Sequence, residues 1–432
     1  MKGLSSSKLR RDVRRWLRGV VQSLPDRWRF ALYRTMIECD TSPDSRLQLK
    51  IAETKEELEA CFRLLHDAYV MSGFMKPDPS GMRITKYHAL PTTTTLCATF
   101  DGRIVGTLSL IRDGVFGFPL QTAFDISGLR AKGGNIAEIS ALAIHPEFRN
   151  TGGWILFPLI KFMYEYCTRY FDTRHLVIAV NPNKIDLYEA VLFFRRLQAA
   201  VVEHYDFANG VPAVGATLDL HQAIDTFRHA YNRKADRRNL YKYFLGIDLP
   251  NIRMPLRPYH TTNDPVLTPP LLDHFFNRMS SVLDSLDQRQ RLLLQSIYGD
   301  QAYESVLPAA MPAESSTLQR VHPRFSIRCP AVLEPFSTQS STAIKLIVTE
   351  LSRSGCRAES SDKLKIGLSG LLRVELGAHR HVLLHAEVIR TINGELPFRY
   401  GFLITRPDTG WLTCADALES GHTYSDLMDL VD

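Results

Sequence analysis

The residues best suited to chemistry in this chain are Glu138 and Ser140. They lie two positions apart in the apolar run of residues 137–144, and alternation along a strand places both side chains on one face. A carboxylate in an apolar strand needs a reason to be there, because burial of an unpaired charge is costly. Glu138 can accept the proton of an amine or align an ammonium group, with Ser140 beside it. The alternative is a structural ion pair between Glu138 and an arginine.

A glycine-bearing loop follows this apolar run. It contains Arg149, Gly152 and Gly153 and leads into a helical stretch near residues 154–170. Glycines before a helix leave backbone N–H groups open, and the positive end of the helix dipole favours an anion there. The loop is therefore a candidate site for a pyrophosphate or a phosphopantetheine arm. An ordinary connecting loop is the alternative.

The elements around these residues predict a β-α-β-α unit within a larger sheet. A second strand is predicted at residues 175–180, followed by a helix that contains Tyr188. Further strands are predicted at 47–52, 94–100, 103–111, 200–207 and 211–220, and Thr54 with Glu57 forms a capping pattern ahead of a helix that runs to about residue 70. Together they predict an α+β or α/β domain over residues 46–245, with a mixed sheet of six or seven strands and helices on both sides.

Several motifs, taken in order, resemble the GNAT acyltransferase fold in the version of the long-chain N-acyl amino acid synthases and acyl-homoserine-lactone synthases. They are Glu138-Ile139-Ser140 with Leu142-Ala143-Ile144, the Arg149-x-x-Gly152-Gly153 loop, and Asn181-Pro182 with Tyr188 and Phe193. The resemblance implies an acyl-carrier-protein or acyl-CoA thioester as acyl donor, an amine such as an amino acid as acceptor, and no metal. It also implies that Tyr188 protonates the leaving thiolate and that Arg63 helps to bind the donor. A core tyrosine and a surface arginine are the alternative interpretations of these two residues.

A second set of motifs stands in the C-terminal part. Arg320 and Arg324 lie four positions apart ahead of a strand, and Glu350, Ser352 and Gly355 form a Glu-x-Ser-x-x-Gly pattern. Paired guanidinium groups can clamp phosphates and stack on guanine, while the serine and glycine supply a hydrogen bond and backbone clearance.

The short strands that follow these motifs predict a small antiparallel barrel. With it, the motifs resemble a PilZ domain at residues 319–432, which implies binding of cyclic di-GMP. PilZ domains have Asp or Asn at the position of Glu350. The alternative interpretation is a degenerate PilZ-like domain that contacts a protein instead of the dinucleotide. Arg324 and Arg328 form a second arginine pair, but the earlier pair places Arg324 at the start of the first strand. His379, His381 and His385 share a strand parity, yet no Cys or carboxylate completes a metal site, so we expect a solvated face.

Positive charge is concentrated at the N-terminus. Residues 1–35 hold ten Lys or Arg against two Asp, whereas the rest of the chain is close to neutral. Basic amphipathic helices are predicted over residues 1–45 and suit an anionic membrane surface or an acidic carrier protein; packing onto the protein body is the alternative. A nucleic-acid partner is not expected, because it would need a basic face on a folded domain.

The remaining composition predicts a reducing compartment. The seven cysteines are scattered without a CxxC pair, which is typical of free thiols. The chain has no apolar run long enough to span a bilayer or to form a signal peptide. We therefore expect a cytoplasmic protein, either free or peripheral at the inner membrane.

Two proline-bearing segments predict a linker at residues 246–318. Between them a helix is predicted at 271–297, with Leu283, Leu286 and Leu293 at helical spacing. We expect this helix to transmit a signal between the two domains, by forming a homodimer or by capping an acyl tunnel. The combined interpretation is a cyclic di-GMP-responsive N-acyltransferase. Because Ala141 and Phe193-Phe194 depart from the synthase pattern, the rival is a non-catalytic cyclic di-GMP effector whose first domain binds a partner protein or a lipid.

Overall fold

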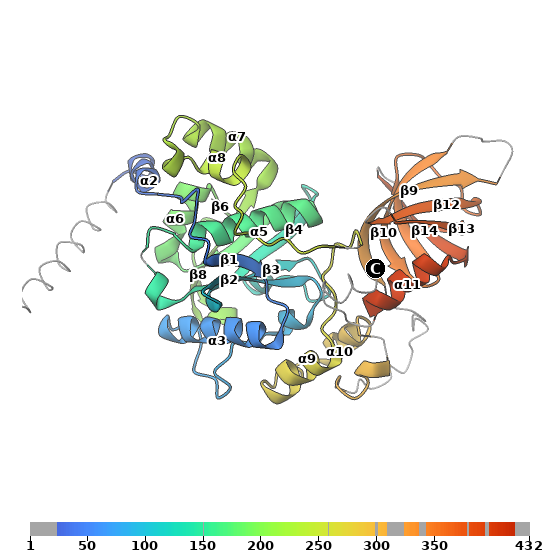
Figure 1. Ribbon diagram of the computed structural model, residues 1–432, viewed down its shortest axis with the longest axis horizontal. Helices are drawn as coiled ribbons and strands as arrows, with labels where there is room; N and C mark the ends of the chain where they lie inside the picture. Colours follow the sequence, from blue (N-terminus) through green and yellow to red (C-terminus); the bar gives the residue numbers. More distant parts are fainter. Residues whose placement is uncertain are drawn as a thin grey trace, which may run out of the picture.

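The chain forms a mixed β-sheet flanked by helices and a separate closed β-barrel (Figure 1). This confirms the predicted fold class. The computed structural model describes residues 24–149, 151–257, 259–298, 301–308, 324–336, 343–377, 380–393 and 397–419.

An eight-stranded sheet forms the first part. Its order is β1-β2-β3-β4-β5-β8-β6, and β7 pairs with β8 off this path. Strands β4 and β5 are parallel, and the other pairs are antiparallel. The bounds are β1 (Leu47–Ile51), β2 (Thr93–Phe100), β3 (Arg103–Arg112), β4 (Asn135–Ile144), β5 (Thr173–Val180), β6 (Arg195–Arg196), β7 (Val202–Tyr205) and β8 (Val211–Asp219).

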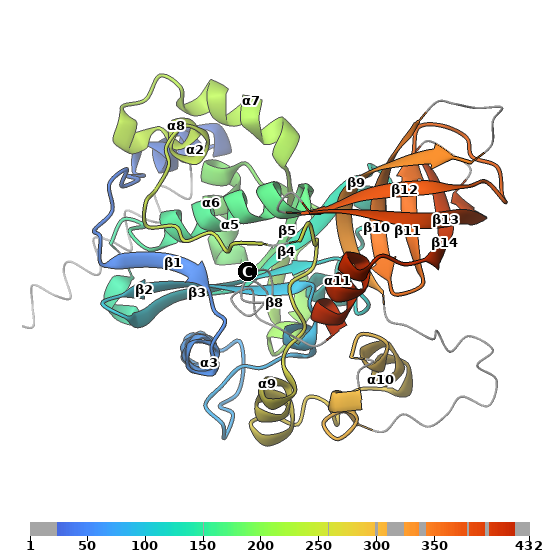
Figure 2. The same ribbon diagram turned by 45° about the vertical axis from the view of Figure 1, so that its right-hand side comes forward.

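Helices cover both faces of this sheet. In Figure 2, α3 lies below the sheet, and α5, α6, α7 and α8 lie above it. The bounds are α2 (Asp26–Thr35), α3 (Lys55–Met71), α4 (Ser127–Arg130), α5 (Leu156–Phe171), α6 (Pro182–Leu192), α7 (Leu220–Tyr231) and α8 (Leu240–Leu245), with short 3-10 turns at Lys86–Ala89, Pro119–Thr122, Pro146–Phe148, Asp206–Ala208, Asp236–Arg238 and Gln301–Tyr303.

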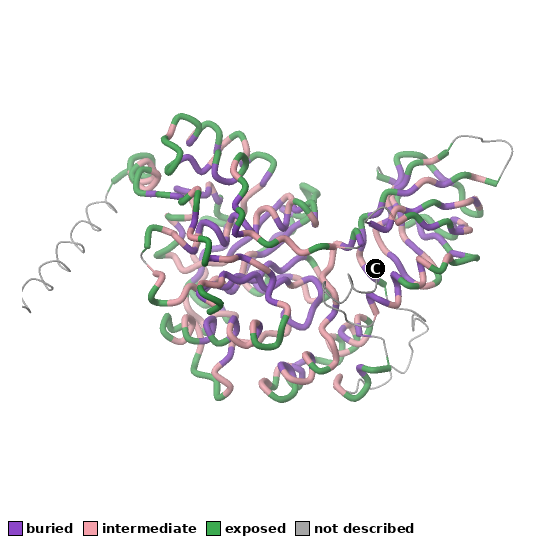
Figure 3. Tube along the Cα trace, in the orientation of Figure 1, coloured by how far each residue is buried: buried purple, intermediate pink, exposed green. Residues whose placement is uncertain are grey.

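Local sequence signals account for where α3 begins and which side it buries. The Glu57 N–H donates to the Thr54 hydroxyl at 3.2 Å, and the Glu57 carboxylate accepts from the Thr54 N–H. This is the capping box that the sequence predicts. Leu58, Phe62 and Leu65, spaced by three or four residues, are buried. In Figure 3 the buried residues of the described part of the chain are found mainly along the strands of the sheet and of the barrel. All seven cysteines are buried free thiols.

Six antiparallel strands close the C-terminal barrel in the order β10-β11-β14-β13-β12-β9. The Trp411 side chain is fully buried, and its Nε1–H donates to the Ser352 carbonyl at 2.9 Å, so the last helix is fixed against the barrel. The sequence predicted neither this helix nor the strand after Ser352. The bounds are β9 (Phe325–Pro335), β10 (Ile344–Ser352), β11 (Gly355–Ser360), β12 (Ser369–Gly377), β13 (Arg380–Asn393), β14 (Phe398–Arg406) and α11 (Thr409–Glu419).

The predicted linker helix at 271–297 is not one helix. The segment forms α9 (Pro269–Asp273), a π-helical turn (His274–Arg278) and, after a break, α10 (Gln288–Gln295). Asp287 caps α10 through the Gln290 N–H at 2.8 Å, so a new helix begins inside the predicted one. The apolar residues of this segment are buried in spite of the break: Leu272, Phe275, Phe276, Leu283, Leu286 and Leu294.

An extended stretch of the linker, residues 259–262, lies along the barrel. The Thr262 N–H donates to the Ser326 carbonyl at 3.0 Å, and the Arg328 N–H donates to the His260 carbonyl at 2.8 Å. The Thr262 and Ser326 hydroxyls are 2.5 Å apart. These residues therefore continue the sheet of the barrel beside β9.

Two residues further on, Asp264 contacts the first domain. Its carboxylate accepts a hydrogen bond from the Tyr166 hydroxyl at 2.9 Å and lies 3.4 Å from the Arg112 guanidinium. The Thr94 hydroxyl also donates to Asp264. Residues 259–264 thus connect the barrel to β2, β3 and α5 of the sheet through short contacts.

The N-terminal helix α2 packs on α6. Arg29 pairs with Asp186 at 3.2 Å and Arg34 donates to the Ala190 carbonyl at 2.9 Å, as the packing alternative for this segment predicts. Trp28 is 59% exposed. The basic helix predicted at residues 7–22 lies outside the described residues. Among the helices that are described, none is long and apolar enough to cross a membrane.

Candidate functional site

A cavity of about 680 Å³ opens where β4 and β5 diverge. The two strands pair only between Asn135–Glu138 and the stretch from Thr173 to Val177. After Glu138 they separate, and residues 139–142 of β4 line the cavity instead of pairing with β5. A strand edge freed in this way can hydrogen-bond an extended chain that carries amides.

Ala141 marks the divergence. Its φ is +54°, and the register between β3 and β4 shifts between Thr107 and Ser109 at the same point. A left-handed backbone at a non-glycine residue costs roughly 1–3 kcal/mol and persists only where the surroundings hold it. The sequence marks Ala141 only as a departure from the synthase pattern, whereas the structure places it at the bulge that turns β4 away from β5.

Glu138 lies at the last paired position and is only 2% exposed. Its Oε2 accepts a hydrogen bond from the Leu120 N–H at 3.0 Å. Burial raises the pKa of Glu138 to about 8, and the bond from Leu120 opposes that rise in part. Within the described part of the chain no ion pair to Glu138 is found, so the predicted structural pair with an arginine is not formed there. A carboxyl with a pKa near neutral can take a proton from an amine.

Tyrosines that the sequence did not single out surround Glu138. Tyr69 and Tyr205 line the cavity beside it, and burial together with the Glu138 charge raises the pKa of Tyr87 to about 12. Burial also raises the pKa of Tyr69 and of Tyr205, and the Glu138 charge adds to both. The phenols therefore stay protonated at neutral pH and can donate hydrogen bonds.

Arg83 packs behind this group of tyrosines. Its guanidinium lies 4.4 Å from the centre of the Tyr69 ring and donates to the Phe207 carbonyl at 2.8 Å. Tyr69 stands in the predicted helix that runs to about residue 70, so it was open to prediction. Arg83, Tyr87 and Tyr205 come from segments far from Glu138 in the sequence and have no spacing signal.

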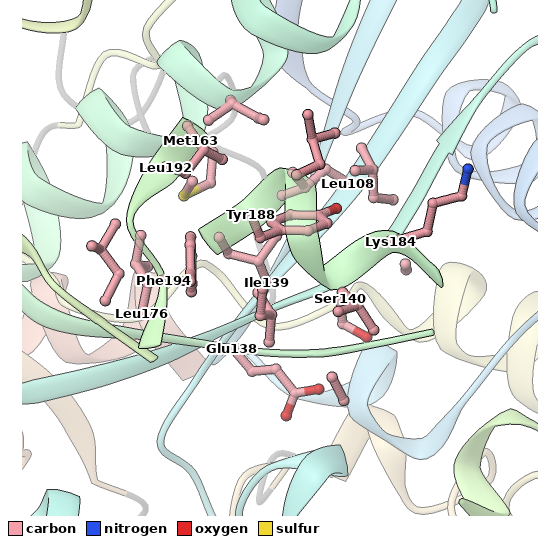
Figure 4. A pocket seen from close by; sticks show the side chains of 18 of the residues that line it. Leu108, Glu138, Ile139, Ser140, Met163, Leu176, Lys184, Tyr188, Leu192 and Phe194 are labelled. Atoms are coloured by element: carbon pink, nitrogen blue, oxygen red, sulfur yellow. The ribbon is translucent and has the colours of Figure 1, made fainter. Parts of the chain in front are cut away.

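Ser140 and Tyr188, two of the predicted catalytic residues, line the same cavity as Glu138. In Figure 4, Ile139 and Ser140 lie between Glu138 and Tyr188. Burial raises the pKa of Tyr188 to about 12, with the nearby Tyr69 adding to the rise. The structure therefore brings Glu138, Ser140 and Tyr188 together around one space, with a basic group on one side and a protonated phenol on the other.

The predicted donor-binding residues Arg149, Gly152, Gly153 and Arg63 are not among the residues that line the cavity. Gly152 and Gly153 have φ of +72° and +93°, and a Cβ at Gly153 would lie 2.5 Å from the Phe157 ring. Arg149 donates to the Ile144 carbonyl at 2.7 Å, which fixes the loop to the end of β4 and ahead of α5. Arg63 is half exposed, 3.6 Å from Glu59, and does not line the cavity.

The larger part of the cavity is apolar. It extends from Tyr188 between the sheet and the helices above it, and its walls are aliphatic and aromatic. Burial of methylene groups in such a space stabilises a bound chain by about 0.8 kcal/mol per CH₂. The apolar lining includes Leu108, Ile160, Met163, Leu176, Ile178, Leu192, Phe194, Leu218, Phe227 and Phe244.

A charged cluster lies at the end of the barrel where β9 begins. The Glu350 carboxylate pairs with Arg324 at 3.3 Å and with Arg357 at 2.6 Å. The Ser352 hydroxyl donates to the Gly355 carbonyl at 3.0 Å, and a Cβ at Gly355 would lie 2.7 Å from a backbone oxygen of β14. Four of the five residues predicted for cyclic di-GMP are thus close together.

The fifth residue of that set, Arg320, lies outside the described residues. Arg357 was not predicted, because it lies in β11, a strand that the sequence pattern did not indicate. Arg328, from the alternative arginine pair, lies 3.7 Å from Asp172 of the first domain. Within the described ranges no group of three or more His, Cys, Asp or Glu could hold a metal ion.

Comparisons with known proteins agree with part of this picture. Residues 60–219 match the family model described as N-acyl amino acid synthase FeeM, which is less than half of the chain. This match supports acyl transfer, in general terms, for the first domain. No curated protein matches the chain.

Three solved structures are similar to portions of the chain. FeeM, an N-acyl amino acid synthase from uncultured soil microbes, is 22% identical, with 42% of this chain and 94% of that chain covered and a TM-score of 0.36. The acyl-homoserine-lactone synthase LasI is 18% identical, with coverages of 41% and 91% and a TM-score of 0.32. The PilZ domain of YcgR from Escherichia coli, solved with cyclic di-GMP, is 14% identical, with coverages of 27% and 98% and a TM-score of 0.20.

The raised pKa of Glu138 predicts a pH-dependent stability. Between 4.5, the ordinary value, and about 8, the folded state holds a proton that the unfolded chain has released. The Glu138 contribution to the free energy of unfolding is therefore largest below this window. It falls by about 1.4 kcal/mol per pH unit as the pH rises through the window. Glu138→Gln, which cannot titrate, should lack this loss. Urea unfolding of both proteins at pH 5 to 8 measures the difference, and a difference that is constant across the window would contradict the raised pKa.

Proposed function

We propose that residues 46–245 form an N-acyltransferase that moves a fatty acyl group from acyl-carrier protein or acyl-CoA to an amine such as an amino acid, and that the barrel makes this activity respond to cyclic di-GMP. The observation that carries the enzymatic half is the position of Glu138. A buried carboxyl with a pKa of about 8 stands where a cavity passes from polar groups to a long apolar lobe. The family match over residues 60–219 points the same way.

The proposed reaction uses the groups on the two sides of β4. The neutral acceptor amine attacks the thioester carbonyl carbon, and Glu138, with Ser140 beside it, takes the proton that the nitrogen loses. A C–N bond forms and the C–S bond breaks. Tyr188 gives its proton to the sulfur, which leaves as a thiol, and the proton held by Glu138 returns to Tyr188 through solvent. The loop at Gly152 and Gly153 would hold the anionic part of the donor at the start of α5.

Glu138→Gln is expected to lower kcat/KM for acyl transfer by about 100-fold or more, as loss of a general base does. In the wild-type protein kcat/KM should rise with pH up to about 8, because only the deprotonated carboxylate accepts the proton. The variant should lack this inflection. The measurement is thiol release from acyl-CoA and from acyl-carrier protein, with an acceptor amine that stays neutral across the pH range.

Arg63→Ala is the matched control, because Arg63 is half exposed and outside the cavity. It should keep the inflection near pH 8. If neither donor is consumed by the wild-type protein with any amine, and no N-acylated amine accumulates in cells that express it, the non-catalytic effector is the better description.

The regulatory half of the proposal rests on the cluster around Glu350. Arg324 and Arg357 bring two guanidinium groups to one carboxylate at the start of β9. A phosphodiester carries the same charge as that carboxylate and can replace it through charge-assisted hydrogen bonds. Ser352 and Gly355 shape the adjoining turn, and Arg320 would complete the site from the preceding segment.

Arg324→Ala should weaken cyclic di-GMP binding by about 10- to 100-fold, which is the loss expected for hydrogen bonds to a charged group. Isothermal titration calorimetry of the full chain measures it. Arg328→Ala is the control, because Arg328 faces Asp172 and not Glu350. An equal loss of cyclic di-GMP affinity in the two variants would contradict the assignment. Absence of binding to the wild-type protein at micromolar cyclic di-GMP would contradict it as well.

We place the transmission of the signal in residues 259–264 and no longer in the predicted linker helix. This stretch hydrogen-bonds to β9 just after Arg324 and ends at Asp264, which contacts Arg112. Arg112 pairs with Ala137 in the β3–β4 ladder, next to Glu138. A shift of β9 on ligand binding therefore has a short contact path to the catalytic strand.

Thr262→Pro should uncouple the two domains, because proline lacks the N–H that bonds to Ser326. We expect cyclic di-GMP to bind with its wild-type affinity while its effect on acyl transfer falls at least several-fold. Thr262→Ala keeps the N–H and is the control. Calorimetry and thiol release on the same preparations give both quantities, and an unchanged ligand effect in Thr262→Pro would rule out this path.

A further inference from the structure

Helices α7 and α8 form a helical cap that lines one part of the cavity. The match to the synthase family ends at residue 219, and α7 begins at Leu220. The cap is therefore an addition to the matched part of the domain. It nevertheless supplies seven of the residues that line the cavity: Leu220, Ala223, Ile224, Phe227, Tyr241, Phe244 and Leu245.

Two aromatic side chains form the wall of this cap. Phe227 of α7 and Phe244 of α8 meet edge to face, with ring centres 5.9 Å apart, and both are less than 10% exposed. Leu245, the next residue, also lines the cavity but is 41% exposed. The pair therefore forms a buried part of the cavity wall, with the exposed Leu245 beside it.

The cap is held rigidly against the domain. Lys161 of α5 is 1% exposed, and its Nζ donates to the Phe244 carbonyl at 3.2 Å while it pairs with Glu165 at 2.6 Å. A buried lysine is costly unless its hydrogen bonds are satisfied, so this one fixes the last turn of α8. On the other side, the fully buried Tyr231 donates to the Val191 carbonyl at 2.9 Å.

We propose that the cap made by α7 and α8 sets the length of the acyl chain, with Phe227 and Phe244 as the wall that the terminal carbons meet. This deepens the proposed function and rests on it. A chain that just fills the lobe gains burial with every methylene. A longer chain must displace the aromatic pair, which Lys161 and Tyr231 hold in place. The preferred substrate is then a chain of one defined length, with a steep loss beyond it.

The test is the profile of acyl-CoA substrates with even chain lengths from four to eighteen carbons. Below the preferred length, each added methylene should raise affinity by about four-fold. Phe244→Ala removes part of the wall and should move the preferred length up by about two to four carbons. Ala223→Leu fills the lobe and should move it down. An unchanged preferred length in both variants overturns the proposal.

Phe193→Ala is the control for loosening of the cap. Phe193 packs on Phe227 with ring centres 5.2 Å apart but does not line the cavity. The Phe193→Ala substitution should lower the melting temperature of the protein and leave the preferred acyl-chain length unchanged. A length shift as large as that of Phe244→Ala would mean that cap mobility and not the wall sets the length, and would also overturn the proposal.

A second readout separates this proposal from the acyltransferase itself. Displacement of a fluorescent fatty acid by the same acyl-CoA series reports binding without turnover. If no variant transfers an acyl group but the displacement series still shifts between wild type and Phe244→Ala, the acyltransferase proposal is wrong and the chain-length proposal is supported. If transfer occurs and the two substitutions change neither profile, the chain-length proposal is wrong and the acyltransferase proposal is supported.

Discussion

The first domain depends on the point at which β4 stops pairing with β5. Parallel neighbours in a sheet normally share a continuous ladder, and here the ladder ends at Glu138. The separation that follows creates the cavity, frees the edge of β4 and leaves Glu138 at the junction. The left-handed Ala141 and the bulge against β3 fix this geometry in the backbone. The side chains then supply the chemistry at a place that the backbone has opened.

Burial of Glu138 costs hydration free energy, and the same burial raises its pKa into the range in which it can act as a base. A carboxyl in an apolar environment loses its hydration, and the single hydrogen bond from Leu120 replaces only part of it. The result is a proton that is held weakly enough to exchange near neutral pH. The protonated phenols of Tyr69 and Tyr205 can stabilise the Glu138 carboxylate by donating hydrogen bonds when it ionises.

Much of the fold was open to prediction because its signals are local. The capping box of α3, the apolar strand that carries Glu138 and the glycines before α5 depend on neighbours in the sequence, and the structure has them where they were predicted. Glu138, Ser140 and Tyr188 also share one cavity, as expected from motifs close to one another. The misses are of two kinds. Arg83 and Tyr205 reach the site only through tertiary packing. The break in the predicted helix at 271–297 has a local signal that the leucine spacing hides, namely the capping box of Asp287 and Gln290 that starts α10.

The buried thiols give the protein a practical property. Because every native cysteine is buried, water-soluble maleimide dyes should reach none of them while the protein is folded. One cysteine introduced on an outer strand of the barrel and another on α3 would then be labelled selectively without removal of the native residues. Energy transfer between such dyes could follow the separation of the two domains in the native sequence background.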